Sequence, residues 1–286
     1  MQPRMQLSRV NDIGGCRAVL ASVDHVYDLQ RALLEQTRAS WELTHLPSKY
    51  DYVARPKDSG YRSVHLVYAY QSDSEEHADF DGQRIEIQLR SKLQHSWATA
   101  NEIAETFTGL PLKSYRGAVA PHDAERFAGW KRFFVLASGV FAYLEGKSPV
   151  PDTPDRIGPL RDDLRRVDDA ISAYHWLKTW RTVVKDVCLP AISTHGEHIK
   201  RFLLTMKKVR EDCYSLTVLP FAEDRQFTAF DAYVLAERAN NAVLVSISSD
   251  SLKDLQTAYP NYYADATSFL ETIRPYLLNG VMMFPK

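Results

Sequence analysis

The sequence predicts an α+β protein that combines a mixed β-sheet with several helices. Polar and apolar residues alternate strictly over residues 84–90 (RIEIQLR), which is typical of a half-buried strand. Apolar residues recur at helical spacing over residues 125–145 and again over residues 160–187. Residues 200–286 show the order strand, strand, helix, strand, helix, which indicates a second, smaller α+β domain.

The first elements of the chain are a short apolar segment and a helix. The segment DIGGCRAVL (residues 12–20) contains two glycines, which allow the backbone of a neighbour to approach closely. We expect a helix over residues 24–42, because its apolar residues share one face. These residues are Val26, Leu29, Leu33 and Leu34.

A hairpin and another helix follow. Residues 63–70 (SVHLVYAY) predict a strand, and the polar run at residues 71–83 ends in Asp-Gly. We therefore expect this run to connect the strand to residues 84–90 as a hairpin. In the next helix, Trp97 shares a face with other apolar residues, and we interpret it as core. Its partners at helical spacing are Leu89, Leu93, Ala100, Ala104 and Phe107.

These elements divide the chain into three parts. Residues 1–115 form the first domain, residues 116–199 a helical connector, and residues 200–286 the small α+β domain. The proline-rich run KSPVPDTPDRIGP stops the preceding helix within the connector.

Composition limits the kinds of partner. The chain has 35 Lys and Arg against 36 Asp and Glu, so its formal net charge is −1. This near-neutral charge does not indicate a binding surface for long nucleic acids. The three cysteines are far apart and lack a CxxC pair, which suits a reducing cytoplasm and favours neither a disulfide framework nor a zinc site. The longest apolar run has 12 residues, too few to span a bilayer. We expect a cytoplasmic protein with no signal peptide and no membrane partner.

Two acidic residues of the first domain stand among cations. Glu86 lies on the polar face of residues 84–90, and Asp12 stands at the start of the apolar segment, so they are candidates for a carboxylate pair on adjacent strands. Mg²⁺ takes one or two carboxylates and completes its octahedron with phosphates and water. The surrounding cations are suited to phosphates. They are Arg17, Arg55, Lys57, Arg62, Arg84 and Arg90.

A turn adds a second part to this predicted magnesium and phosphate site. Residues 56–60 (PKDSG) are turn formers, and Lys57 within them is a point charge for a phosphate. Tyr61 follows the turn, where an aromatic ring is a platform for a nucleobase. His65 stands four residues later, on the polar face of the next strand.

These motifs resemble those of the RelA/SpoT synthetase family, whose members make the alarmone nucleotides (p)ppGpp. The family carries a string like DIxGxR, a loop like PKxNGYRSxH, and a strand like EIQxR before a helix with Trp. This chain has DIGGCR, PKDSGYRSVH, EIQLR and then Trp97, and the match covers about residues 5–108. The resemblance implies a nucleotidyltransferase-like synthetase domain with a mixed sheet flanked by helices.

The implied reaction, part of the bacterial stringent response, transfers pyrophosphate from ATP to the 3′-hydroxyl of GDP or GTP with Mg²⁺. Asp12 is implied as a magnesium ligand, and Glu86 as the second acid that positions metal or deprotonates the acceptor. Tyr61 is implied as the residue that stacks on the guanosine base. Further contacts to acceptor or phosphate are implied for Lys57, His65, Arg55 and Gln88.

Two departures from the family pattern leave alternatives open. Eleven residues precede Asp12, with Arg4 and Arg9 as cations, where the family has a basic segment that grips the donor ATP. Residues 48–51 read SKYD where many members have an Arg-x-Lys-Asp string. The alternatives are a toxin-like pyrophosphokinase acting on tRNA or adenosine nucleotides, and a nucleotide-binding module without transfer. The oligomeric state stays open.

The family's longer members also hydrolyse their product with spaced histidines and aspartates. The sequence has a single His-Asp dipeptide, at residues 122–123 in a proline-containing loop. We interpret it as a turn or a helix cap, and we expect no hydrolase activity.

Overall fold

A computed structural model describes residues 14–36, 40–72, 74–112, 119–183, 199–210, 213–237, 242–246 and 266–278. The chain divides into two compact units. The first comprises residues 1–97 and 135–162, and the second comprises residues 98–134 and 163–286. These boundaries differ from the three predicted parts, because residues 92–108 and 124–144 form helices that contribute to both units.

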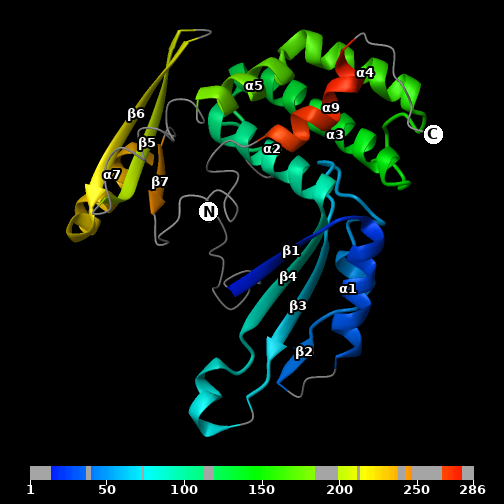
Figure 1. The fold of residues 1–286 in the computed structure, drawn as a ribbon, viewed down its shortest axis with the longest axis vertical. Coiled ribbons are helices and arrows are strands. Elements are labelled where there is room, and N and C mark those ends of the chain that lie inside the picture. The colour runs from blue at the N-terminus through cyan, green and yellow to red at the C-terminus, as the bar shows by residue number, and fades with distance from the viewer. Residues whose placement is uncertain are drawn as a thin grey trace. The chain divides into compact units, whose positions relative to one another are not determined.

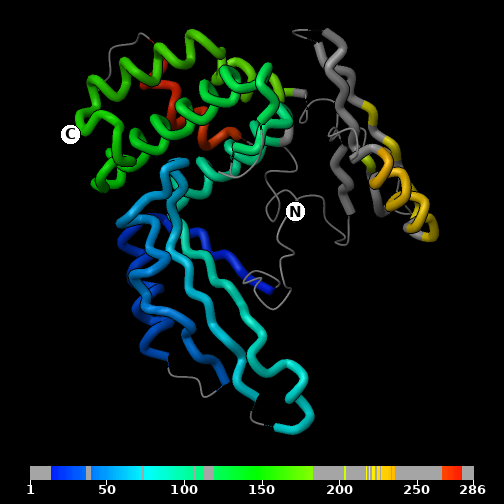
Figure 2. The backbone as a smooth tube through the Cα atoms, turned by 180° about the vertical axis from the view of Figure 1, so that it is seen from behind, coloured from blue at the N-terminus to red at the C-terminus, as the bar shows by residue number. Residues whose placement is uncertain are grey.

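The first unit contains a four-stranded sheet with the order β1-β4-β3-β2 (Figure 1). The strands are β1 (Gly14–Leu20), β2 (Trp41–Leu43), β3 (Val64–Tyr70) and β4 (Arg84–Ser91). β1 runs parallel to β4, whereas β3 is antiparallel to both β4 and β2. Figure 2 shows the same strands from behind. The predicted mixed sheet is confirmed.

The connection between β3 and β4 is the predicted hairpin. It contains the 3-10 turn η3 (Glu75–Phe80), after which Gly82 has a φ of 74°. This left-handed conformation favours glycine, which explains the Asp-Gly signal. The amide of Gly82 donates to the carbonyl of Tyr70 at 2.8 Å and closes the hairpin.

Helix α1 (Val23–Glu35) covers one face of this sheet. Its first turn is capped by Ser22, whose hydroxyl accepts from the amide of His25. The helix was expected to reach residue 42 and is shorter. Trp41 and Leu43 instead form β2, where they lie opposite Tyr70 and Tyr68 of β3. Cross-strand aromatic packing therefore overrides the helical spacing of this segment.

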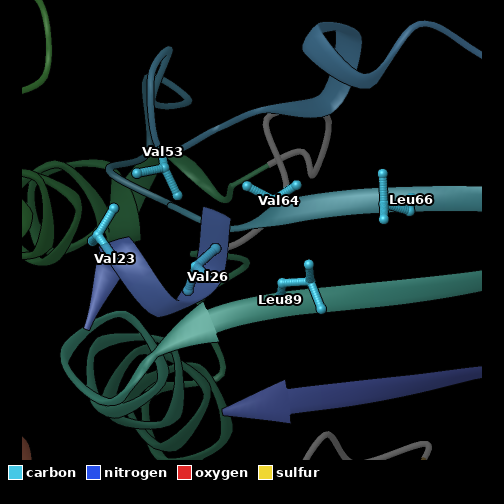
Figure 3. Close-up of a cluster of buried hydrophobic side chains, with 6 residues drawn as sticks. All are labelled: Val23, Val26, Val53, Val64, Leu66 and Leu89. Atoms are coloured by element: carbon cyan, nitrogen blue, oxygen red, sulfur yellow. The ribbon is translucent and has the colours of Figure 1, made fainter. Parts of the chain in front are cut away.

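The core of the first unit lies between α1 and the sheet (Figure 3). Its buried residues come from the helix, from the segment before β3, and from β3 and β4. They are Val23, Val26, Val53, Val64, Leu66 and Leu89. Because neighbouring residues of a strand point to opposite faces, the residues between these positions face away from α1. Trp97 is also buried, as predicted.

The helices are α2 (Lys92–Thr108), α3 (Ala124–Leu144), α4 (Ile157–Ile171), α5 (Ala173–Val183) and α9 (Thr267–Leu277). One helix was expected over residues 160–187, but it breaks at Ser172, which has a φ of 54°. The carboxylate of Asp168 accepts from the amide of Tyr174 at 2.8 Å and begins α5. Residues 184–187 lie outside the described part.

In the second unit, Trp130 and Phe107 stack on Trp180.

A second sheet has the order β6-β5-β7. Its strands are β5 (Ile199–Arg210), β6 (Cys213–Ala222) and β7 (Ala242–Ser246), and α7 (Gln226–Glu237) lies between β6 and β7 in sequence. This confirms the predicted order of strand, strand, helix and strand. Of the helix expected at residues 251–278, only Ala266–Leu278 is described, and it contains α9. No helix among the described residues is long and apolar enough to cross a membrane.

Candidate functional site

The polar side chains of β4 lie on the face of the sheet opposite α1. Strand pairing places Gln88 between His65 of β3 and Arg17 of β1. Glu86 and Arg90 share this face with Gln88, because they are two residues away along the strand. The alternation seen in the sequence therefore gathers these side chains on one surface.

A closed circuit of hydrogen bonds joins five side chains on this face. Arg90 donates through Nη2 to the hydroxyl oxygen of Tyr61 at 2.6 Å and to Oε1 of Gln88 at 2.8 Å. Gln88 donates through Nε2 to Oε1 of Glu86 at 3.1 Å. His65 closes the circuit: its Nδ1 pairs with Oε1 of Glu86, and its Nε2 lies 2.7 Å from the hydroxyl of Tyr61. We call these five residues the polar circuit.

The direction of the bonds fixes the proton on His65. A carboxylate can only accept, so Nδ1 of His65 carries the imidazole proton and donates it to Glu86. A guanidinium can only donate, so the hydroxyl of Tyr61 accepts from Arg90, and its own proton is available to Nε2 of a neutral His65. Burial lowers the pKa of His65, although hydrogen bonding to Glu86 opposes this effect. A neutral imidazole is the form that this arrangement holds at neutral pH.

Glu86 is held in its ionised form by the same hydrogen bonds. The hydrogen bond from His65 is the largest influence on it and lowers its pKa, although burial acts in the opposite direction. Gln88 and the nearby charge of Lys57 lower the pKa further. Among the described residues, both hydrogen bonds to Glu86 fall on Oε1.

The turn at residues 56–61 brings a cation to aromatic rings beside the polar circuit. Nζ of Lys57 lies 4.3 Å from the ring centroid of Tyr52 and 4.9 Å from that of Tyr61. Burial of the ammonium lowers the pKa of Lys57. The turn is closed by the amide of Gly60, which donates to the carbonyl of Lys57 at 2.8 Å. A cation held over aromatic rings is suited to a nucleotide, which offers both phosphate and base.

Tyr52 is a member of this site that the sequence reasoning missed. Its ring meets the ring of His65 edge-on at 5.3 Å between centroids, and that of Tyr61 at 6.0 Å. Its amide donates to the carbonyl of Ser63, which holds its segment beside β3. The repeated tyrosines in the string YDY, three residues before the turn, were the available signal.

Other predicted site residues lie at the edge of this surface or elsewhere. Arg17 is exposed on β1 and donates through Nε to Oε1 of Gln88 at 3.4 Å. Arg55 is exposed and donates to the backbone carbonyl of Ser48. Arg84 is exposed at the start of β4. Asp12, predicted as a metal ligand, lies outside the described residues.

Arg62 does not join the polar circuit. Its side chain is 3% exposed and donates to the carbonyl of Val53 at 3.0 Å, the hydroxyl of Ser138 at 3.3 Å and the carbonyl of Ser148 at 2.5 Å. Burial lowers the pKa of Arg62 to about 10. Its donors are thus used within the protein, and the structure gives the predicted phosphate contact no support.

The chemistry of Glu86 fits a magnesium ion. A carboxylate that is charged at neutral pH is a ligand that Mg²⁺ prefers, and phosphates and water supply the rest of the octahedron. The described residues contain no group of three or more His, Cys, Asp or Glu that could hold a metal ion. A site built from Glu86 would therefore depend on the phosphates of a bound nucleotide and on ligands outside the described residues.

A cavity of about 290 Å³ lies on the other face of the sheet, away from the polar circuit. Its lining is mainly apolar and includes Leu33 of α1 and Ile85 and Ile87 of β4. It lacks the carboxylate and cations that phosphate chemistry requires. The candidate site is therefore the polar circuit with Lys57.

Two sequence comparisons match the first part of the chain to known proteins. Residues 1–105 match the model of a family described as the region found in RelA / SpoT proteins. GTP pyrophosphokinase YjbM of Bacillus subtilis (strain 168) is 32% identical over 100 residues, which are 34% of this chain and 43% of that protein. The chain therefore spans less than half the length of this curated relative. The match confirms the family resemblance and includes the whole polar circuit and Lys57.

Solved structures of small alarmone synthetases are also similar to part of the chain. Small alarmone synthetase 2 from Bacillus subtilis has a TM-score of 0.34 at 19% identity, over 49% of this chain and 64% of that one. Small alarmone synthetase 1 from Bacillus subtilis, bound to its product pppGpp, has a TM-score of 0.33 at 22% identity, over 50% of this chain and 66% of that one.

Proposed function

Because residues 1–105 carry the region found in RelA / SpoT proteins, we propose that this chain is a (p)ppGpp synthetase. The proposed reaction transfers pyrophosphate from ATP to the 3′-hydroxyl of GDP or GTP and releases AMP. The observation that carries the proposal is the polar circuit, in which Glu86 is held as a charged carboxylate beside the cation Lys57. The relative that is 32% identical is a GTP pyrophosphokinase, which agrees with this reaction class.

The site supplies the positioning and charge that such a transfer requires. Phosphoryl-type transfer depends mainly on alignment of the reactants and on neutralisation of their charge. Lys57 would bind a phosphate of the acceptor, and the rings of Tyr52 and Tyr61 beside it would offer a surface for the base. Glu86, and Asp12 as predicted, would hold Mg²⁺, which would offset the charge of the phosphates.

Glu86 would also receive the proton of the attacking hydroxyl. His65 and Gln88 both hold Oε1, so in the described part of the site Oε2 is the oxygen left for a substrate or a metal. His65 is itself fixed by Tyr61, so the carboxylate keeps its orientation. A fixed acceptor needs no rearrangement during the reaction, which is how preorganised groups lower a barrier.

An assay with labelled ATP tests the proposal. The full chain is incubated with Mg²⁺ and with GDP, GTP, ATP or tRNA, and the products are resolved. Label on guanosine tetra- or pentaphosphate supports the proposed synthetase. Label on tRNA, or on an adenosine nucleotide that has gained the transferred pyrophosphate, supports the toxin-like alternative, and nucleotide binding without transfer supports the binding module.

A matched pair of variants assigns the activity to this site. Glu86→Gln should lower transfer by at least about a hundredfold, because it removes the charge that metal and proton require. Glu42→Gln is the control, since Glu42 lies on β2 and accepts a hydrogen bond from Gln71 outside the polar circuit. Equal activity in the two variants would contradict the assignment.

A further inference from the structure

The end of α3, residues 135–144, is hydrogen-bonded to the turn that carries Lys57 and Tyr61. Residues 135–144 of this helix belong to the same unit as the polar circuit, although they follow the family match that ends at residue 105. The hydroxyl of Ser138 donates to the carbonyl of Gly60 at 2.6 Å. Ser138 is 1% exposed, so this bond is shielded from water. A buried hydrogen bond of this kind costs more to lose than an exposed one.

Arg62 fixes the direction of the Ser138 hydroxyl. Its Nε donates to Oγ of Ser138 at 3.3 Å, which leaves the hydroxyl proton for Gly60. The same guanidinium donates to the carbonyls of Val53 and Ser148. The buried Arg62 therefore joins three segments around Ser138.

Gly60 is the residue that shapes the turn. It has a φ of 88°, its amide donates to the carbonyl of Lys57 at 2.8 Å, and the amide of Lys57 donates to the carbonyl of Tyr61 at 3.2 Å. Holding the carbonyl of Gly60 thus restrains the backbone of both Lys57 and Tyr61. Their side chains are the cation and the aromatic ring of the candidate site.

A second set of hydrogen bonds connects the end of α3 to the end of strand β4. Glu145 follows the helix and accepts hydrogen bonds from the hydroxyl of Ser91 and, at 3.0 Å, from Nε2 of Gln94. Ser91 is the last residue of β4 and follows Arg90 of the polar circuit. The helix end is therefore bonded to both chain segments that carry site residues.

We infer that Ser138 is a positioning residue for nucleotide binding and that the end of α3 is part of the synthetase site. Ser138 acts through Gly60, which sets the turn that presents Lys57 and Tyr61. The inference rests on the proposed function for the identity of the ligand. The restraint on the turn is a property of the protein without ligand.

The test compares three variants of the full chain. Ser138→Ala removes the donor to Gly60, and Ser138→Cys keeps a weak donor of similar size. Ser96→Ala is the matched control: Ser96 is also a buried helical serine, and its hydroxyl bonds to the carbonyl of Leu93 within α2. Hydrogen exchange of the peptide covering residues 57–61 measures the turn, calorimetric titration with GDP measures binding, and thermal melting measures stability.

Ser138→Ala should exchange the amides of Gly60 and Tyr61 about tenfold faster than the wild type, as expected for the loss of one buried hydrogen bond. The Kd for GDP should rise by about the same factor, with Ser138→Cys between the two. Ser96→Ala should leave the exchange of the turn and the affinity for GDP unchanged.

Two results would overturn the inference, and a third would overturn the proposed function. Equal exchange of the turn in Ser138→Ala and Ser96→Ala would show that Ser138 does not restrain it. Faster exchange with unchanged GDP affinity would show that the restraint does not serve binding. If the wild-type chain binds no GDP, the proposed function fails, while faster exchange in Ser138→Ala alone still supports the restraint on the turn.

Discussion

The Nε2 atom of His65 lies 2.7 Å from the hydroxyl oxygen of Tyr61, which links the turn to strand β3. The two residues stand four apart in sequence but belong to different elements. This bond fixes the imidazole in the form that donates its Nδ1 proton to Glu86. The orientation of the carboxylate therefore depends on a tyrosine that does not touch it.

Removal of this hydroxyl should change the pKa of His65 while the fold is kept. In Tyr61→Phe, Nε2 loses the donor that stabilises the neutral imidazole, so the pKa of His65 should rise. Titration of the imidazole nitrogens by NMR measures this shift. Tyr143→Phe is the control, because Tyr143 is exposed on α3. An unchanged His65 titration in Tyr61→Phe would show that the bond does not set the imidazole form.

The stability of the chain should fall as the pH falls below 6.5. Burial lowers the pKa of folded His65 from its ordinary value of 6.5, so the unfolded chain binds the proton first. The pKa of Glu86 is also lowered, so its contribution is present above its ordinary value of 4.5 and is lost as the pH falls further. Urea unfolding between pH 7.5 and about pH 4 follows both losses.

A variant distinguishes the contribution of His65 to the pH dependence of stability from that of the other histidines. His65→Gln removes this titration, so its unfolding free energy should depend less on pH between about 6.5 and 5 than that of the wild type. An equal dependence in both proteins would assign the effect to other groups.

The charge of Lys57 should govern nucleotide affinity. Lys57→Met keeps an unbranched side chain over the rings of Tyr52 and Tyr61 but removes the charge, so the Kd for GDP should rise by at least about tenfold. The difference between the two proteins should shrink at high salt, because salt screens the contribution of the ammonium. Lys178→Met on α5 serves as the control. Calorimetric titration at two salt concentrations makes the comparison.

The core between α1 and the sheet should account for a large share of the stability of the first unit. Leu89 is 0% exposed, and Leu89→Ala should lower the free energy of unfolding by about 2–5 kcal/mol. Val19→Ala on β1 is the exposed counterpart and should change it by less than about 0.5 kcal/mol. Chemical denaturation measures both. A small loss in Leu89→Ala would mean that the core repacks around the missing side chain.

Much of the local structure followed from residue patterns. Alternation over residues 84–90 predicted β4 and placed Glu86, Gln88 and Arg90 on one face, because a strand has a strict period of two. The Asp-Gly signal predicted the hairpin before β4, because a left-handed residue is needed there. Helix lengths were less well predicted. Trp41 forms part of strand β2 because it pairs with Tyr70 of β3. Ser172 interrupts the predicted helix over residues 160–187, although the apolar residues keep their helical spacing beyond it.

The sequence by itself determined the α+β class, the polar face of β4, and a turn with a cation and an aromatic residue. These are properties of neighbouring residues, and local sterics and periodicity decide them. Only the tertiary structure decided which cations serve the site. Arg62 and Arg90 belong to adjacent motifs and are both buried, yet Arg90 bonds to Tyr61 and Gln88 while Arg62 holds the end of α3. The physical reason is that these bonds depend on the pairing of strands and on helix packing, which join residues far apart in the chain.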